Sequence, residues 1–121
     1  MELKQLEHDF AVCRLRSTTH VDFANAFTFL SKTDDEISLV CTADTVPDDA
    51  TEVEKDWKGL KIHGILDFGM IGVIARLSNI LAERRISIFV VSTYNTDYIF
   101  LKNEQYAEAV AALRENGYHI S

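Results

Sequence analysis

Two short stretches, Leu66–Gly72 and Ser92–Asp97, hold the residues whose types and spacing favour ligand binding. Each follows a run typical of a β-strand, so backbone amides and short polar side chains gather where two strands end. Gly72, at a helix start, would let a carboxylate approach unpaired amide groups, and the carboxylates of Asp67 and Asp97 could hold an ammonium group. If the two strand ends are neighbours, the sequence predicts a small polar pocket suited to a zwitterion.

The elements that must position these stretches follow from hydrophobic periodicity. Apolar residues in Leu60–Leu66 predict a strand. From Ile71 to Arg84 they repeat at helical spacing, which predicts an amphipathic helix of about fourteen residues. Ile86–Ser92 is apolar on both faces and therefore predicts a central, covered strand. Tyr98–Leu101 is expected to return from it as a hairpin partner.

A second helix and a last strand complete the pattern. Asn103 is a suitable N-cap for a helix with one apolar face, and Gly117 is a suitable C-terminal stop. Tyr118–Ile120 leaves room for a short strand. The order from Leu60 is therefore β, α, β, β, α, β, which predicts an α+β, ferredoxin-like sandwich.

The first half echoes this order with poor or missing helices. Strands are predicted at His8–Leu15, Phe27–Leu30 and Ile37–Cys41, the last two joined as a hairpin. The acidic stretch Asp44–Asp56 is interpreted as a solvated surface connection, because its acids lack calcium-loop spacing; an effector-facing or metal-attracting patch is the alternative. The sequence thus predicts a degenerate half at residues 1–56 and a complete one at 57–121.

Composition and charge narrow the classes of partner. The chain has 19 acidic and 12 basic side chains, and its formal net charge of −7 opposes a phosphate backbone, so nucleic acid is not an expected partner. The apolar runs are far shorter than the ~20 residues of a membrane span. The first residues lack a signal-peptide pattern, so we expect a cytoplasmic protein with no membrane partner. Cys13 and Cys41 are expected to be buried free thiols.

The second half resembles the ACT domain, a regulatory module that binds small molecules and has a βαββαβ fold. The resemblance rests on the strand Leu60–Ile65, the run Asp67–Ala75 that enters the first helix, and the strand Ile86–Phe89 that leads to Ser92–Tyr98. It is most similar to the branch found in aspartate kinase regulatory regions and in small stand-alone bacterial proteins with two ACT-like halves. It is more distantly similar to cytosolic arginine sensors. The first half resembles the family only loosely.

The resemblance implies a ligand site at the turn from the first strand to the first helix, facing the end of the second strand in the same domain or in a partner. Gly72 matches the glycine that lets the ligand approach the backbone, and Asp97 is placed to meet an ammonium or guanidinium group. The implied ligand-binding residues are Asp67, Phe68, Gly69, Met70, Ile71, Gly72, Ser92, Thr93, Tyr94, Asn95, Thr96 and Asp97. The first half has no second helix entry with an aspartate and a glycine, so the resemblance carries no site over to it.

Other motifs in the chain have simpler explanations. Asp67–Gly69 spells the magnesium-binding tripeptide of protein kinases, but the chain is too short for a kinase and lacks a catalytic loop. Gly69–Gly72 spells the G-x-x-G of KH domains, with apolar middle residues in an acidic chain. The four histidines lack metal-site spacing. We therefore expect no catalysis, no metal and no other cofactor.

Two hypotheses about function follow. The first is a non-catalytic metabolite sensor that binds a small molecule, most plausibly an amino acid, and alters an oligomer or a protein target. The second is an oligomerisation or protein-interaction module without a ligand. Phe89, Tyr98 and Phe100 are expected in core packing or a subunit contact rather than on an RNA-binding face, while Tyr94 and Tyr98 are either walls of the site or packing residues. Because so short a chain would otherwise expose sheet edges, we expect a homodimer.

Overall fold

The computed structural model describes residues 1–63 and 71–121, and these form two compact units. The N-terminal unit is His8–Trp57. The C-terminal unit combines Met1–Glu7 with Lys58–Ser121, so the N-terminal unit is an insertion in its sequence. The division of the sequence into two ACT-like halves after residue 56 stays a prediction, because compactness alone does not show that the two units are related.

The C-terminal unit contains a sheet with the strand order β6-β7-β5-β1-β8. Its strands are β1 (Glu2–Gln5), the last residues of β5 (Glu52–Ile62), β6 (Ile88–Ser92), β7 (Asp97–Lys102) and β8 (His119–Ile120). Without β1 this is the order of the predicted ferredoxin-like βαββαβ unit, in which the first strand lies between the third and the fourth. Strand β1 is inserted there, antiparallel to β5 and parallel to β8.

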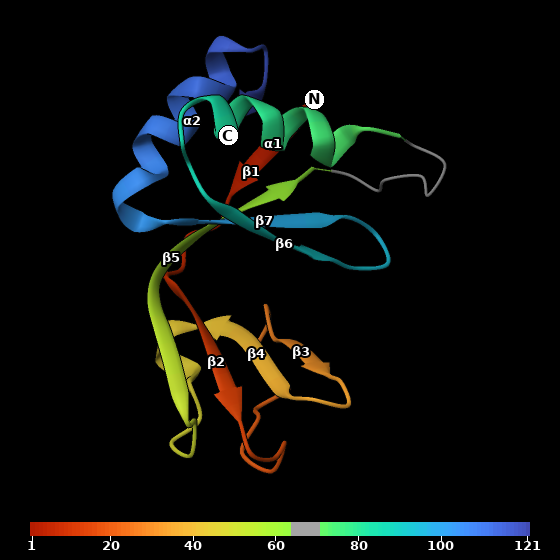
Figure 1. Cartoon of the computed structure of the whole chain (residues 1–121), viewed down its shortest axis with the longest axis vertical. Helices are drawn as coiled ribbons and strands as arrows, with labels where there is room; N and C mark the ends of the chain where they lie inside the picture. Colours follow the sequence, from red (N-terminus) through yellow and green to blue (C-terminus); the bar gives the residue numbers. More distant parts are fainter. Residues whose placement is uncertain (64–70) are drawn as a thin grey trace. The chain divides into compact units, whose positions relative to one another are not determined.

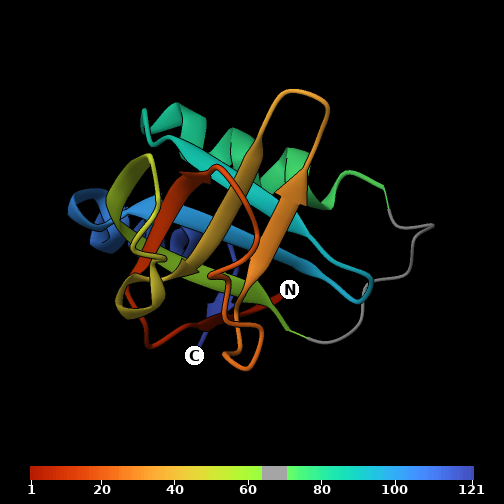
Figure 2. The same cartoon turned by 90° about the horizontal axis from the view of Figure 1, so that it is seen from below.

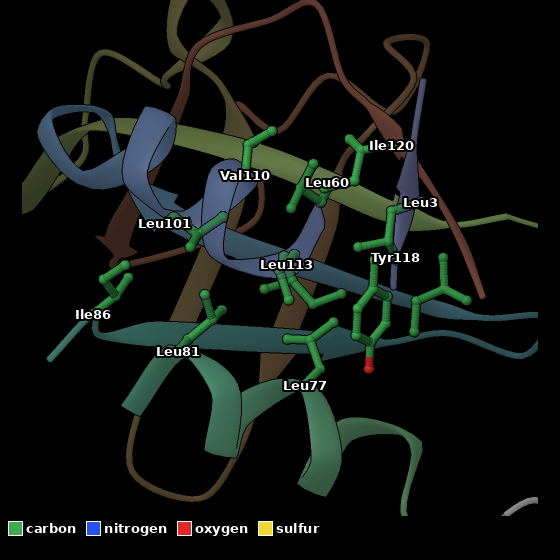
Figure 3. Close-up of a cluster of buried hydrophobic side chains, with 13 residues drawn as sticks. Leu3, Leu60, Leu77, Leu81, Ile86, Leu101, Val110, Leu113, Tyr118 and Ile120 are labelled. Carbon is green, nitrogen blue, oxygen red and sulfur yellow. The ribbon is translucent and has the colours of Figure 1, made fainter. Parts of the chain in front are cut away.

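Two helices, α1 (Val73–Glu83) and α2 (Tyr106–Glu115), lie on one face of this sheet (Figure 1). Leu77 and Leu81 of α1 are fully buried between the helices and the sheet (Figure 3), and shortening either to alanine would cost about 2–5 kcal/mol. The buried cluster consists of Leu3, Leu60, Ile62, Leu77, Leu81, Ile86, Ile99, Leu101, Ala109, Val110, Leu113, Tyr118 and Ile120.

Both helices end with the same backbone motif. After α2, Tyr118 N–H donates to Leu113 O, and Gly117 has a φ of +92°, so the predicted glycine stop is confirmed. After α1, Arg85 takes the corresponding left-handed position with a φ of +58°. The N-cap prediction at Asn103 is wrong, because Asn103 begins the 3₁₀ turn η2 (Asn103–Gln105) that precedes α2.

The prediction of a central strand at Ile86–Ser92 is also wrong. Strand β6 pairs with β7 alone in the part of the chain that the structure describes, so it is a sheet edge. Its apolar side chains have another cause: Ile88 and Val90 pack under the helices, while Phe89 stacks on Phe100 at a ring distance of 4.9 Å. A strand with apolar residues on both faces therefore needs cover on both faces, but not a neighbour on both edges.

The N-terminal unit has the same strand order without α-helices. Its sheet runs β3-β4-β2-β5, with β2 (Phe10–Leu15), β3 (Phe29–Lys32), β4 (Ile37–Thr42) and the first residues of β5. Where a ferredoxin-like unit has helices, this unit has the irregular link 16–28 and a link that starts with the 3₁₀ turn η1 (Ala43–Thr45). This is the degenerate half that the sequence predicts, and strand β5 belongs to both units.

The two units repeat at a constant spacing of 60 residues over the hairpin and the turn after it. Strand β4 corresponds to β7, and η1 corresponds to η2, each shifted by 60 residues. The hairpin turns are built alike: Thr33 N–H donates to Glu36 O, and Thr93 N–H donates to Thr96 O. The repeat is therefore present in the backbone, although the two hairpin sequences differ.

The acidic connection is shorter than expected, because β5 already begins at Glu52. Glu52 and Glu54 pair with Arg14 and Val12 of β2, and the Arg14 and Glu52 side chains approach to 3.9 Å. Asp56 has a φ of +69° close to an irregularity in this pairing. Backbone hydrogen bonds hold a strand whose side chains point to solvent, so its composition resembles that of a loop.

Both cysteines are buried free thiols, as predicted. They lie on one face of the N-terminal sheet, where the Cys13 thiol donates to the carbonyl of Leu39. Burial raises the pKa of Cys13 to about 12 and also raises the pKa of Cys41. The folded protein therefore keeps both groups as thiols at neutral pH.

This burial predicts a loss of stability at alkaline pH. As the pH rises past 9.0, the ordinary thiol pKa, the unfolded chain loses its cysteine protons before the folded one does, so stability falls from about pH 9 toward pH 12. Urea unfolding at pH 7, 9 and 10.5 should show a larger loss for the natural chain than for a Cys13→Ala, Cys41→Ala double variant. Equal losses would show that the thiols do not titrate differently on folding.

Candidate functional site

The start of α1 is an open helix N-terminus. Gly72 precedes the helix with a φ of +80°, no side chain in residues 1–63 or 71–121 caps this end, and its first turn has no acidic residue. Within the described residues, the first amide groups of the helix therefore have no side-chain partner and can meet an anion. A Cβ built on Gly72 would meet no described atom within 4 Å, so the backbone angle requires glycine here and the space beside it is open.

The turn between β6 and β7 is held by its two threonines. The Thr93 hydroxyl donates to Thr96 O at 3.0 Å, in addition to the backbone bond at 2.8 Å. Thr96 is buried, and its hydroxyl donates to the carbonyl of Ile62 at 2.9 Å. Because Ile62 is the last residue of β5, this bond joins the hairpin turn to the end of the first strand of the C-terminal unit.

Ser92 and Asp97 are paired at the turn end of this hairpin. Side chains alternate along a strand, and Val90 and Ile99, two residues away, pack into the core beneath the helices. Ser92 and Asp97 therefore lie on the helix-covered face of the sheet. The Asp97 carboxylate is half-buried and makes no hydrogen bond or ion pair with residues 1–63 or 71–121.

The hairpin turn and the start of α1 lie at the same end of the C-terminal unit in both views (Figures 1 and 2). A helix N-terminus, a serine hydroxyl and an aspartate carboxylate are therefore presented at one end of one face. This arrangement can bind a negative group at the helix and a positive group at Asp97.

The remaining predicted site residues differ in their surroundings. Asp67, Phe68, Gly69 and Met70 lie outside the described residues. Ile71 and Tyr94 are strongly exposed, and Asn95 is exposed at the tip of the turn. Tyr98 is on the opposite face, where the Lys61 ammonium lies 5.8 Å from its ring centre, so it is not a wall of the site on the helix side.

The corresponding end of the N-terminal unit lacks these groups. The 60-residue repeat places Lys32 and Ile37 where the C-terminal unit has Ser92 and Asp97. The link after β2 contains no α-helix. Of the two hairpins, the one in the C-terminal unit therefore combines a serine and an aspartate with a helix start, and the one in the N-terminal unit does not.

The N-terminal unit has instead an open cleft of about 500 Å³. Asp22 in this cleft is engaged within its own loop, because its carboxylate accepts the Ala24 N–H at 2.9 Å. Within the described ranges, no group of three histidine, cysteine or acidic side chains could hold a metal ion. The lining residues are His20, Asp22, Asn25, Asp44, Thr45, Val46, Pro47, Asp48 and Asp49.

Strand order and helix placement define a ferredoxin-like α+β protein built from one complete and one degenerate unit. A family model of the ACT domain matches residues 52–115, and the chain belongs to the ACT domain family. A second family model, for an N-terminal domain, matches residues 8–49. No curated protein sequence matches the chain. In residues 1–63 and 71–121, no helix has the length and apolar character to cross a membrane.

Solved structures share this fold. A protein from Agrobacterium tumefaciens is 27% identical, with a TM-score of 0.87 over 99% of this chain and 91% of that one. A protein of unknown function from Vibrio cholerae, described as a possible transport protein, is 18% identical, with a TM-score of 0.72 over 92% and 85%. The regulatory subunit of aspartate kinase from Thermus thermophilus, in its ligand-free form, is 10% identical, with a TM-score of 0.65 over 93% and 95%.

The geometry at Gly72 predicts a measurable cost for any side chain there. Gly72→Ala should lower the free energy of unfolding by about 1 kcal/mol, because alanine at positive φ is strained. Gly117→Ala is the matched control, since Gly117 also has positive φ and open space beside it. Urea unfolding should give similar losses for both variants, and smaller ones for asparagine at either position. An unchanged stability for Gly72→Ala would contradict the left-handed helix start.

Proposed function

We propose that this protein is a non-catalytic, cytoplasmic regulatory module that binds an amino acid at the end of its C-terminal unit. The observation that carries the proposal is the presence of Ser92, Asp97 and the open N-terminus of α1 at one end of the helix-covered face. Membership of the ACT domain family supports a regulatory role. The likeness to the regulatory subunit of an aspartate kinase supports the same role at the level of the fold.

In this proposal the two charged ends of the amino acid are held separately. The α-carboxylate accepts hydrogen bonds from amides at the start of α1, where Gly72 leaves room for its approach. The α-ammonium group pairs with Asp97, and the Ser92 hydroxyl completes the polar shell. An amino acid has around ten heavy atoms, so about −6 to −8 kcal/mol, a Kd of tens of micromolar to micromolar, is within reach.

We further propose that the module acts as a homodimer through β6. This strand is an edge among the described residues, and Ile88, Phe89, Val90 and Val91 are each only partly buried. An apolar edge strand with unpaired backbone groups is a template for pairing with a second chain. A ligand bound at the hairpin end of β6 could then change the stability of this pairing or the surface offered to a protein target.

The exposed edge also favours the second candidate function, an oligomerisation or protein-interaction module without a ligand. That function needs β6 but not Asp97 or the open helix start. The two candidates therefore differ in what Asp97 does, and Asp97 is the residue to change.

A thermal-shift screen against the twenty amino acids tests the proposal. A ligand at 100 times its Kd should add about 2.7 kcal/mol of stability, and the effect should vanish in Asp97→Ala because the ammonium loses its partner. Asp34→Ala is the control, since Asp34 lies in the corresponding turn of the N-terminal unit. Gly72→Ala should also lose the shift, and Gly117→Ala should keep it. A folded dimer with no shift for any amino acid would favour the module without a ligand.

A further inference from the structure

We propose that the cleft of the N-terminal unit is a second binding site, and that it takes a small organic cation with more than one ammonium group. This site is separate from the one at the end of the C-terminal unit, because all the residues that line it belong to His8–Trp57. Three features support it: the cleft itself, the unpaired carboxylates along it, and one carboxylate oxygen that the fold buries without a partner.

The cleft is lined by residues of the two links that take the place of helices in this unit. Val21 of the first link and Val46 and Ala50 of the second pack against the buried cluster of the sheet that contains both cysteines. Short links thus cover the sheet where helices would fill more space. They leave an open cleft of about 500 Å³, which is within the range of about 300–1,000 Å³ that is usual for small-molecule sites.

The cleft carries negative charge that no basic side chain of the two links balances, since residues 17–28 and 43–51 contain no lysine or arginine. Of the four aspartates in the lining, Asp22 accepts hydrogen bonds from the Ala24 N–H and the Asn25 amide. The other three have no hydrogen bond or ion pair from their side chains to any described residue; they are Asp44, Asp48 and Asp49.

Asp49 provides an independent indication of a ligand. Its Oδ1 atom is buried and has no hydrogen-bond partner in residues 1–63 or 71–121. A buried carboxylate oxygen without a donor is unfavourable in a folded protein. The terminal torsion of an aspartate side chain is soft, so a small rotation turns this oxygen toward the cleft that the residue lines. An ammonium group bound there would supply the missing donor.

The spacing of the carboxylates decides which kind of cation fits. A metal ion needs several ligand atoms around one point, and among the described residues no three histidine, cysteine or acidic side chains are placed to hold one. The unpaired carboxylates are instead spread over residues 44–49. An aliphatic diamine or polyamine can form a charge-assisted hydrogen bond with a different carboxylate at each ammonium group, and its methylene chain can contact Val46 and Pro47, which also line the cleft.

Isothermal titration calorimetry at constant ionic strength tests the inference. Spermidine and 1,4-diaminobutane are the probes with several ammonium groups, butylamine is the matched monoamine, and calcium chloride supplies a metal ion. Spermidine and the diamine are expected to bind at least about tenfold more tightly than butylamine or Ca²⁺. Equal affinity for butylamine, tighter binding of Ca²⁺, or no binding of spermidine would overturn the inference. The proposed amino acid site is tested separately by Asp97→Ala, which should leave spermidine binding unchanged.

Isosteric substitutions separate a built site from the general attraction of an acidic protein for cations. Asp49→Asn should weaken spermidine binding at least about tenfold. Asp34→Asn is the matched control, because Asp34 is exposed in the hairpin turn of the same unit and the substitution removes the same charge; it should change the affinity by less than about twofold. Asp44→Asn and Asp48→Asn give the same comparison if Asp49→Asn does not fold. Equal weakening by the cleft and control substitutions would overturn the inference.

Discussion

The candidate site depends on the buried hydrogen bond from the Thr96 hydroxyl to the carbonyl of Ile62. That carbonyl ends β5, and a buried acceptor without a partner would cost about 1–3 kcal/mol, so the bond holds the hairpin turn at the end of the first strand. This turn also fixes the positions of Ser92 and Asp97, because the two residues directly flank it. Thr96, which the sequence predicts as a ligand contact, is in the structure a buried residue that positions Ser92 and Asp97.

Strand β5 connects the sheets of the two units. One continuous strand closes the N-terminal sheet and opens the C-terminal one, and the hairpins of the two units repeat at 60 residues. The copies differ in what covers their sheets. Where the C-terminal copy has α1, with an open N-terminus beside a polar strand end, the N-terminal copy has an irregular link and carries Ile37 in place of Asp97. The strand order is thus common to both copies, whereas the helix and the aspartate of the candidate site are found in the C-terminal copy.

Much of this fold can be predicted from the sequence, and the failures have physical causes. The helix at α1 and the strand at β7 are confirmed because their apolar spacing is strong. Strand β1 was not predicted, since four residues with two charges carry little pattern and its place is set by pairing with β5 and β8. The sequence does not predict the start of β5, because exposed acidic residues are typical of a loop. Backbone pairing with β2 nevertheless holds these residues in a strand. For the site, types and spacing indicate Gly72 and Asp97, but only the structure shows that Thr96 is buried and that Tyr98 faces the other side.

The central claim is that one end of the C-terminal unit holds both charged ends of an amino acid. Titration of the ¹⁵N-labelled protein with the amino acid that gives the largest thermal shift, followed in two-dimensional NMR spectra, tests it most directly. The account predicts shifts of the amides at residues 72–75 and 92–97, and none in the corresponding turn at residues 33–36. Shifts confined to the N-terminal unit, or spread along β6 with residues 72–75 unchanged, would contradict it.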